Sequence, residues 1–473
     1  MDSEMVQTLP RHIHLVGIGG IGLSAIARVL AAWGYQVSGS DQRASAITQE
    51  LNQQGIVTYV GHAGTQVADA ELVVISSAVP ETNAEVQAAR AAGIPVIKRQ
   101  QLLGLMMADS VGVAVAGTHG KTTTTAMLSV MLTRLNLSPT FIVGGIVSEL
   151  GTNAQAGKGP HFVIEADEYD RMFHGLRPRI AVVTNLEMDH PDCYPTMADY
   201  RQAFATFLER VPADGQIVAC VDGSELAALL RERDHRGPRA LTYGISPEAE
   251  YQVRDVAANA RGGVDFCVVR EGQLWGSFTL SVPGRHNALN ATAALLVAEC
   301  LGIDRASAGQ ALAEYRGVLR RFEVKGERQG VVVVDDYAHH PTEIRATLAA
   351  ARARYPGRRL WAVWQPHTYS RTEALLNEFR SCFADADQVI ITDIYAARAR
   401  EQATIHGEAL AVAIDHAHVR YLGSLERVVE TLGNELCSGD VLITLGAGDG
   451  YLIGERILVK LGKGQDDESG RVA

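Results

Sequence analysis

The ten residues from Ala116 to Thr125, AGTHGKTTTT, contain the residue types that bind the phosphates of a nucleotide. Glycines at 117 and 120 let backbone N–H groups approach phosphate oxygens, and a helix that starts just after them directs its positive end at the anion. From this position Lys121 can reach terminal phosphates, and the hydroxyl of Thr122 can coordinate Mg²⁺. The stretch predicts a phosphate-binding loop; the alternative is a glycine turn whose threonines cap a helix.

The spacing of this loop differs from the common one. Four residues usually separate the first glycine from the Gly-Lys-Ser/Thr end, whereas only Thr118 and His119 lie between Gly117 and Gly120. The loop nevertheless stands between an apolar run, VGVAVAG, and a helical pattern that starts at Lys121. This context favours a distinct kind of nucleotide loop over a chance match.

Polar residues also follow several other apolar runs. In open parallel sheets, ligands bind beyond the carboxyl ends of the strands, so residues at these positions are candidates for a site. Glu165 ends the run HFVIE and can hold the cation that bridges phosphates. His190 follows IAVVTN beside acidic residues and is either a second metal ligand or a hydrogen-bonded core histidine. The further residues in such positions are Glu187, Asp189, Asp335, Asp336, His339, His340, His367 and Arg371.

Two other groups of residues are candidates for holding a nucleotide. Arg320 and Arg321, like Arg371, can clamp a phosphate or carboxylate with a bidentate guanidinium, although surface arginines are common. His286 and Asn287 stand at the start of a predicted helix, where they either cap it or grip a base.

A second glycine cluster, GIGGIG from Gly17 to Gly22, lies between a predicted strand and a predicted helix. Asp41 ends the next strand about 20 residues later, which matches the dinucleotide fingerprint. The glycines, however, require only a pyrophosphate at a helix N-terminus. NAD and a nucleotide-diphosphate sugar satisfy this pattern equally.

The elements that position these residues form three blocks. Short apolar runs alternate with alanine-rich helical patterns, which is typical of βαβ units with a parallel sheet. The predicted boundaries give domains at 1–107, 108–317 and 318–473. Between about 240 and 282 the pattern changes to short alternating runs that indicate antiparallel strands, and the polar, glycine-rich residues from 462 onwards indicate a disordered tail.

Length and composition narrow the class of protein. With 473 residues, the chain is long enough for about three domains. Its net charge of -11 disfavours nucleic acid and anionic membrane surfaces as partners. We expect a cytoplasmic protein, because no run reaches the ~20 apolar residues of a membrane span and the start lacks an export signal. Six scattered cysteines without a CxxC pair disfavour a zinc site and a disulfide framework.

Taken together, the motifs resemble those of the Mur ligases of bacterial cell-wall synthesis. The resemblance covers about residues 12 to 450 and rests on GIGGIG, SGSD, GTHGKTTTT, EADE, TNLEMDHPD, GRHNALNA, RRFE, DDYAHHPTEI and QPHTYSRT. It implies N- and C-terminal Rossmann-like domains around a central P-loop ATPase domain. It also implies an enzyme that uses ATP and Mg²⁺ to join L-alanine to UDP-N-acetylmuramate, through an acyl phosphate. We expect a monomer or a homodimer, and the sequence does not decide between them.

The resemblance further implies roles for individual residues. The ATP site would comprise Gly117, Thr118, His119, Gly120, Lys121, Thr122, Thr123, His286, Asn287 and Asp336, the last as a ribose contact. The metal ligands would be Thr122, Glu165 and His190. The sugar nucleotide would bind Gly17, Gly19, Gly20, Gly22, Asp41, Ser76 and His340. Catalysis would involve Lys121, His190, Arg321, His339 and Arg371, with His190 or His339 assisting removal of the amine proton.

One feature departs from part of this family, and other functions stay open. Several sister ligases carry a carbamylated lysine downstream of the His190 motif, whereas no lysine occurs from Leu186 to Gln216. The nearest alternative is a recycling ligase that adds a preformed peptide to the same sugar nucleotide. A second alternative, of another class, is an NAD(P)-dependent oxidoreductase, which leaves the central loop without a purpose. A third is a nucleotide-binding scaffold without catalysis.

Overall fold

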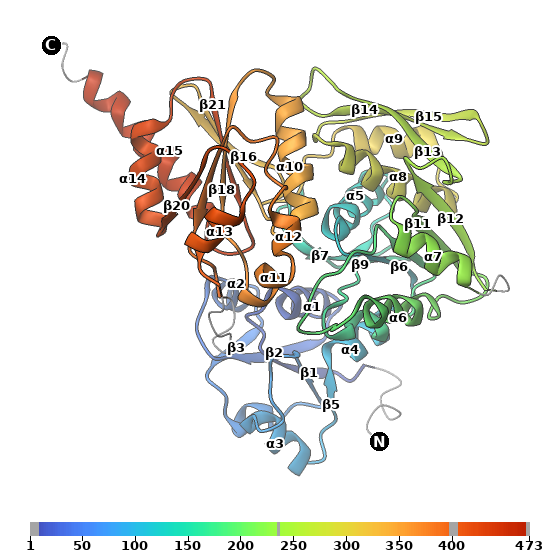
Figure 1. Cartoon of the computed structure of the whole chain (residues 1–473). Helices are drawn as coiled ribbons and strands as arrows, with labels where there is room; N and C mark the ends of the chain where they lie inside the picture. The colour runs from blue at the N-terminus through green and yellow to red at the C-terminus, as the bar shows by residue number, and fades with distance from the viewer. Residues whose placement is uncertain (1–8, 234–236, 397–404, 470–473) are drawn as a thin grey trace. The chain divides into compact units, whose positions relative to one another are not determined.

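The structure is a computed structural model that describes residues 9–233, 237–396 and 405–469. The described chain contains three β-sheets, each accompanied by helices (Figure 1). It divides into two compact units. Unit 1 comprises residues 1–187, 197–252 and 290–312, and unit 2 comprises residues 188–196, 253–289 and 313–473. Each unit is described by itself.

The N-terminal sheet of unit 1 has five parallel strands in the order β3-β2-β1-β4-β5. Its central strand is buried and apolar apart from His12 and His14, which fits a sheet covered on both faces. The strands are β1 His12–Val16, β2 Gln36–Asp41, β3 Val57–Val60, β4 Leu72–Ile75 and β5 Val96–Lys98, and the helices are α1 Ile21–Ala32, α2 Ala46–Gln53, η1 Gly64–Val67, α3 Ala84–Ala91 and α4 Arg99–Met107.

The second sheet of unit 1 holds the predicted nucleotide loop. Its strands lie in the order β12-β11-β10-β6-β9-β7-β8, and all pairs are parallel except β7 with β8. The strands are β6 Val111–Ala116, β7 Thr140–Val147, β8 Thr152–Gln155, β9 His161–Glu165, β10 Ile180–Val183, β11 Gln216–Cys220 and β12 Arg239–Gly244; the helices of this part are α5 Lys121–Arg134, η2 Tyr169–Gly175, α6 Met197–Leu208 and α7 Ser224–Glu232.

The predicted antiparallel region is only partly antiparallel. β14 Val264–Arg270 and β15 Gln273–Leu280 form an antiparallel hairpin in unit 2. The run YQVRDV, by contrast, pairs in parallel with β12, so that part of the expectation is wrong. The strand β13 Tyr251–Ala258 and the helices α8 Arg285–Cys300 and α9 Arg305–Ala313 contain the points at which the chain passes between the units.

The third sheet lies in unit 2 and has the order β16-β17-β21-β18-β19-β20, with only the edge strand β16 antiparallel among its assigned pairs. Alternate residues of β17 enter opposite cores: Val332 and Val334 pack on one side, and Val331 and Val333 on the other. The strands are β16 Glu323–Arg328, β17 Val331–Asp336, β18 Arg359–Trp364, β19 Gln388–Thr392, β20 Val419–Gly423 and β21 Asp440–Leu445; the helices are α10 Pro341–Arg354, α11 Tyr369–Ala374, α12 Leu376–Phe379, α13 Gly407–Ala413, α14 Leu425–Glu435 and α15 Tyr451–Ser469.

The α/β class with parallel sheets is confirmed. The expected disordered tail is not found between 462 and 469, because α15 continues to Ser469; residues 470–473 lie outside the described residues. Over the parts of the chain that are described, no helix has the length and apolar character needed to cross a membrane.

Candidate active site

The predicted phosphate-binding loop connects β6 directly to α5. Its two glycines have backbone conformations in the left-handed region, with φ of 133° at Gly117 and 78° at Gly120. A Cβ atom at Gly117 would lie 2.1 Å from Oγ1 of Thr184, and one at Gly120 would lie 2.6 Å from Oδ1 of Asn290. Both positions therefore require glycine for conformation and for space.

The loop is held from the side by the residues that follow β10. The N–H of His119 donates to Oδ1 of Asn185 over 2.9 Å, and Nδ2 of Asn185 donates back to the carbonyl of His119 over 3.2 Å. The hydroxyl of Thr184 also donates to this carbonyl. These contacts fix the backbone of His119, which explains how a loop with two fewer residues keeps a defined shape.

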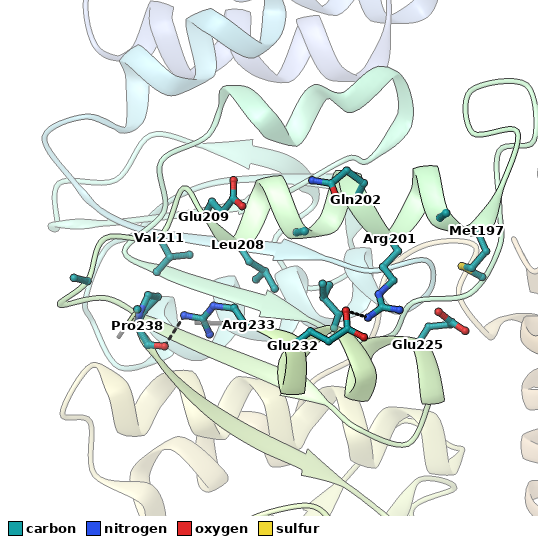
Figure 2. Close-up of a pocket in the computed structure, with 15 residues that line it drawn as sticks. Met197, Arg201, Gln202, Leu208, Glu209, Val211, Glu225, Glu232, Arg233 and Pro238 are labelled. Atoms are coloured by element: carbon teal, nitrogen blue, oxygen red, sulfur yellow. Dashed lines mark hydrogen bonds and ion pairs between the residues drawn. The ribbon is translucent and has the colours of Figure 1, made fainter. Parts of the chain in front are cut away.

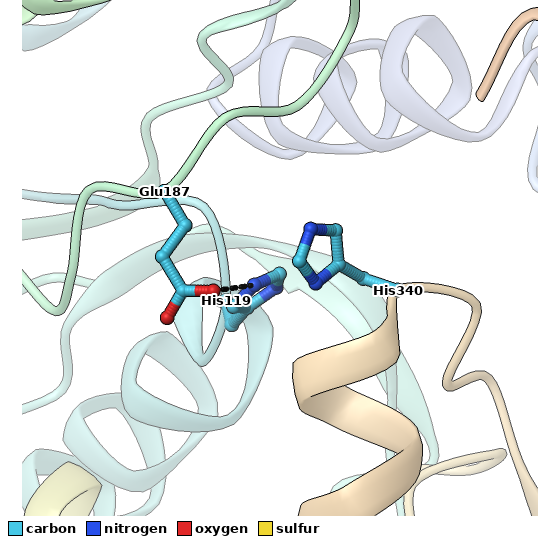
Figure 3. A group of neighbouring side chains, drawn as sticks. All are labelled: His119, Glu187 and His340. Carbon is cyan, nitrogen blue, oxygen red and sulfur yellow. Dashed lines mark ion pairs between the residues drawn. The ribbon is translucent and has the colours of Figure 1, made fainter. Parts of the chain in front are cut away.

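Glu187 makes a second connection to the loop. The Thr118 hydroxyl donates to the Glu187 carbonyl over 2.8 Å, and the Glu187 N–H donates to the same hydroxyl oxygen over 2.9 Å. The Nε2 atom of His119 lies 3.6 Å from a carboxylate oxygen of Glu187 (Figure 3). His340, also drawn there, belongs to unit 2 and is described with it.

Lys121 folds back over its own loop. Its Nζ donates to the carbonyls of Gly117 and Thr118 over 2.6 and 3.1 Å, and to Oε1 of Glu168 over 2.9 Å. Burial by itself would lower the pKa of Lys121, but the charges of Glu168 and Glu165 outweigh it and raise the pKa. The ammonium group is therefore charged and placed at the loop, as phosphate binding requires.

Glu165 and Thr122 form a set of oxygen donors at the end of β9. The Thr122 hydroxyl donates to Oε1 of Glu165 over 3.0 Å, while Oε2 accepts from the N–H of Gly144 over 2.7 Å. A carboxylate and a hydroxyl this close fit Mg²⁺, which prefers a few protein oxygens beside substrate phosphates. Thr123, the next residue of α5, is part of the same first helical turn.

The N-terminal glycine cluster is held by the end of β2. The N–H groups of Gly17 and Ile18 donate to the carbonyl of Ser40 over 2.8 and 3.0 Å, and that of Gly19 donates to Oδ2 of Asp41 over 3.0 Å. Gly20 is the N-cap of α1, where an anion meets free N–H groups. Ser76 lies beside this loop, because a Cβ atom added at Gly17 would be 3.2 Å from its Oγ. The structure therefore brings the predicted sugar-nucleotide residues of unit 1 together.

A cavity of about 300 Å³ lies between this glycine cluster and Glu165, the predicted metal ligand. Gly22 and Ile21 of α1 line it together with Glu165 and Asp167. Arg99, at the start of α4, lies directly under α1, because a Cβ at Gly22 would be 2.0 Å from its Nη1. The glycine cluster and the predicted metal ligand of unit 1 therefore face one space.

A larger cavity of about 860 Å³ lies between α6 and α7 (Figure 2). Arg201 pairs there with Glu232, and Arg233 donates to the carbonyl of Pro238 over 2.8 Å. This cavity contains none of the residues predicted for phosphate, metal or sugar binding. We assign the active site by its chemistry, to the smaller cavity and the loop beside it.

In unit 2, Arg371 and Asp189 form a buried ion pair. Nε of Arg371 donates to Oδ1 of Asp189 over 2.8 Å, and the two side chains are 7 and 4 % exposed. Burial would raise the pKa of Asp189, but the charge and hydrogen bond of Arg371 outweigh it and lower the pKa far below its usual range. His190 itself has a φ of 53°, an uncommon conformation for this residue type, and its N–H donates to Asp189 over 2.7 Å.

His339 is neutral in its surroundings. Burial, the largest influence, lowers its pKa to about 3. Its Nδ1 lies 2.9 Å from the carbonyl of Tyr337, and a carbonyl only accepts, so the ring proton is on Nδ1. This leaves Nε2 as the basic atom, which is the form required of a proton acceptor.

Three other predicted residues of unit 2 have contacts that organise the backbone. Both carboxylate oxygens of Asp336 accept backbone N–H groups, from Phe322 and Ala338, each over 2.8 Å. Burial raises the pKa of Asp336 to about 6, against the opposing charge of Arg321. Nδ1 of His340 accepts from Thr342, so the ring caps α10. Asn287 donates to the carbonyl of Pro283 over 2.7 Å at the start of α8.

Three further basic candidates of unit 2, Arg321, Arg320 and His286, differ from one another in their contacts. Arg321 lies 3.7 Å from Glu343 and stacks over Tyr337. Its neighbour Arg320 donates to Asp335 over 3.0 Å and to the carbonyl of Gly446 over 2.8 Å, so it joins parts of the fold. Burial lowers the pKa of His286 to about 4.

Three contributors to the loop were not among the predicted site residues: Glu168, Thr184 and Asn185. The rule that selected polar residues after apolar runs applies equally to Thr184 and Asn185, which follow IAVV directly. Glu168 stands three residues beyond β9 among other acids, and no pattern separates it from them. Its contact with Lys121 depends on the placement of β9 next to β6.

Comparison with known proteins identifies the family to which this chain belongs. Three family models match the chain: "Mur ligase family, catalytic domain" over 12–110, "Mur ligase middle domain" over 115–298, and "Mur ligase, glutamate ligase domain" over 320–448. The chain belongs to the Mur ligase family.

Within this family, the chain is similar to proteins named UDP-N-acetylmuramate--L-alanine ligase. The protein from Acidobacterium capsulatum is 46 % identical over 440 residues, covering 93 % of this chain and 95 % of the relative. That of Geobacter sp. is 44 % identical over 452 residues, covering 95 and 97 %.

Solved structures give the same grouping. UDP-N-acetylmuramate-alanine ligase from Thermotoga maritima aligns with a TM-score of 0.79 at 29 % identity, covering 96 % of this chain and 99 % of the other. A murein peptide ligase from Psychrobacter arcticus aligns with a TM-score of 0.68 at 25 % identity, over 96 and 99 %. These matches do not support the oxidoreductase alternative.

Proposed function

We propose that this protein ligates L-alanine to the lactyl carboxylate of UDP-N-acetylmuramate at the expense of ATP, in the synthesis of peptidoglycan precursors. Similarity at 40 to 46 % identity to ligases of this name, over nearly the whole chain, supports the reaction. The observation that carries it in the structure is the single cavity shared by Gly22 of the glycine cluster and Glu165 beside the phosphate loop. A sugar nucleotide and ATP must react with each other, so their binding elements have to face one space.

The chemistry has two stages, because a carboxylate and an amine do not condense directly in water. In the first, a lactyl carboxylate oxygen attacks the γ-phosphorus of ATP, giving an acyl phosphate and ADP. In the second, the alanine amine attacks the acyl carbon, and the tetrahedral intermediate expels inorganic phosphate. Both stages gather negative charge, which fixed cations and N–H groups stabilise.

Lys121 is the residue that stabilises the negative charge on the phosphates of ATP. Its Nζ already rests on two loop carbonyls and Glu168, so it is positioned before ATP binds. Thr122 and Glu165 would hold Mg²⁺, which neutralises phosphate charge, and we keep His190 as a further proposed ligand. The backbone N–H groups of the loop add to the same positive site.

For the second stage we propose His339 as the group that accepts a proton from the alanine ammonium. Its Nδ1 proton is directed to the Tyr337 carbonyl, which leaves the lone pair on Nε2 as the acceptor. Arg321 and Arg371 are proposed contacts for the anionic parts of the reactants. We also keep several other predictions as proposals. These are the remaining residue roles, the domain boundaries at 107 and 317, the cytoplasmic location and a monomeric or homodimeric state.

One assay tests this function. Purified protein with Mg²⁺ and ATP is given UDP-N-acetylmuramate and labelled L-alanine, together and each alone, and phosphate release and labelled product are measured. We expect phosphate release only with both substrates, in equal amounts with the labelled product. Phosphate release that does not require both would refute the proposal, and preference for a preformed peptide over alanine would identify a recycling ligase.

A further inference from the structure

A buried acid lies beneath the glycine cluster, outside the residues that the proposed mechanism uses. Glu85, in the first turn of α3, has a side chain with no exposed surface (Figure 1 shows α3 beside the N-terminal sheet). Its Oε1 is 3.1 Å from Nε2 of His14, which is also fully buried. Its Oε2 accepts the hydroxyl proton of Ser40 over 2.6 Å and lies 2.8 Å from Nδ1 of His62. A buried carboxylate is costly unless it is paired in this way.

The contacts continue along β1 and β2 on the same face of the sheet. Nδ1 of His14 lies 2.8 Å from the hydroxyl of Ser38, its cross-strand partner. The same hydroxyl lies 2.9 Å from Nε2 of His12. At the far end, Nδ1 of His12 lies 2.7 Å from the carbonyl of Asp69. The polar groups therefore form one line from a carbonyl oxygen to a carboxylate.

The hydrogen bonds at Glu85 oppose the cost of burying this acid. Burial would raise the pKa of Glu85, but the hydrogen bonds from His14, Ser40 and His62 outweigh it and lower the pKa. The carboxylate is therefore held from both of its oxygens by side chains of three different segments.

The acid is connected to the glycine cluster through Ser40. The Ser40 side chain binds Glu85 from below, while its carbonyl accepts the N–H groups of Gly17 and Ile18. The next residue, Asp41, accepts from Gly19. The end of β2 thus connects Glu85 with three consecutive residues of the loop, Gly17, Ile18 and Gly19.

We infer that Glu85 is a positioning residue for the sugar nucleotide: with His14 and His62 it holds Ser40, and through Ser40 the glycine cluster, in the shape that accepts the diphosphate. This inference rests on the proposed function. It assigns to Glu85 no contact with the substrate, because its side chain is fully buried. Its effect is on the binding of one substrate and not on the ATP loop.

Two substitutions test it in the full-length protein. Glu85→Gln keeps the shape of the side chain but removes the charge, and Ser40→Ala removes the connection to β2 alone. For both we expect the KM for UDP-N-acetylmuramate to rise by roughly tenfold or more, since small displacements of a binding loop weaken binding strongly. The KM for ATP and kcat at saturating sugar nucleotide should stay near the wild-type values. Glu81→Gln, an exposed acid paired with Arg90 just before α3, is the matched control and should leave all three constants unchanged.

A second control examines the line of contacts itself. Ser38→Ala interrupts the line between His12 and His14 without touching Ser40, so it should leave the KM for the sugar nucleotide unchanged.

The outcomes separate this inference from the proposed function. A wild-type protein without alanine-dependent phosphate release contradicts the proposed function. Wild-type turnover with an unchanged sugar-nucleotide KM in folded Glu85→Gln overturns the role of Glu85. An equal loss of ATP and sugar-nucleotide binding, with a lowered melting temperature, also overturns it, because it would show general destabilisation. Binding of UDP-N-acetylmuramate measured by calorimetry gives the same decision if a variant is too slow to assay.

Discussion

Lys121 and Glu168 form a salt bridge of 2.9 Å at the mouth of the phosphate loop, with the carboxylate fully buried. The lysine comes from the first residue of α5, and the acid lies three residues beyond β9. The parallel pairing of β6 with β9 brings these two strand ends together. The pair holds the ammonium group at the loop, and the two loop carbonyls that it also contacts prevent it from swinging into solvent.

The first prediction concerns this lysine. Lys121→Ala should reduce ATP-dependent product formation by about 10²-fold or more, because it removes a fixed charge from the site where negative charge develops. Phosphate release under saturating substrates measures the effect. Lys158→Ala, which changes an exposed lysine of the same unit, should behave like the wild type. Normal turnover in Lys121→Ala would mean that the loop does not bind the reacting phosphates.

The second prediction separates backbone strain from loss of space in the loop. Gly120→Ala places a Cβ at 2.6 Å from Asn290 in a residue with φ of 78°, whereas Gly272→Ala has nearly the same φ of 77° with nothing within 4 Å. Each should lose about 1 kcal/mol of stability from the left-handed conformation. Only Gly120→Ala should also raise the KM for ATP. Urea unfolding and steady-state kinetics measure the two effects, and equal kinetic behaviour would contradict the assignment of this glycine to the site.

The third prediction concerns acid stability. The pKa of Asp189 is lowered in the folded chain, so its ionised form stabilises the fold above the unfolded-state pKa of about 3.9, and this contribution is lost as the pH falls below it. In the wild type, the free energy of unfolding should fall as the pH drops below 4. In Asp189→Asn this fall should be smaller by roughly 2 kcal/mol. Urea titrations at several pH values measure the slope. Asp214→Asn, an exposed acid paired with Arg179, should keep the wild-type slope; an unchanged slope in Asp189→Asn would argue against the buried pair.

The fourth prediction concerns the metal. Chelation of Mg²⁺ should stop phosphate release, and Glu165→Gln should raise the Mg²⁺ concentration needed for half-maximal turnover by about tenfold, since one charged ligand is lost. A Mg²⁺ titration at fixed ATP gives this value. Glu209→Gln, an exposed acid, is the control and should titrate like the wild type. A variant of Glu165 with the wild-type Mg²⁺ requirement would remove this residue from the metal site.

Several parts of the site followed from local patterns. Gly117, Lys121 and Glu165 were predicted because each stands at the end of an apolar run, and the structure places their side chains or backbone around one loop. Asn185 follows the same rule, since it stands two residues beyond the apolar run IAVV. Glu168 obeys no local rule, since its neighbours Asp167 and Asp170 have the same chemistry and only Glu168 among these three receives the hydrogen bond of Lys121.

The sequence by itself determined the alternation of strands and helices, the positions of the two glycine clusters and the family. Each of these depends on residue type and on spacing along the chain, which folding does not alter. Only the tertiary structure decided which acid pairs with Lys121, that Arg320 is used to join parts of the fold, and that Glu85 lies under the loop that begins 68 residues earlier at Gly17. The order of strands in a sheet sets these neighbours, and a parallel sheet brings together strand ends that are far apart in sequence.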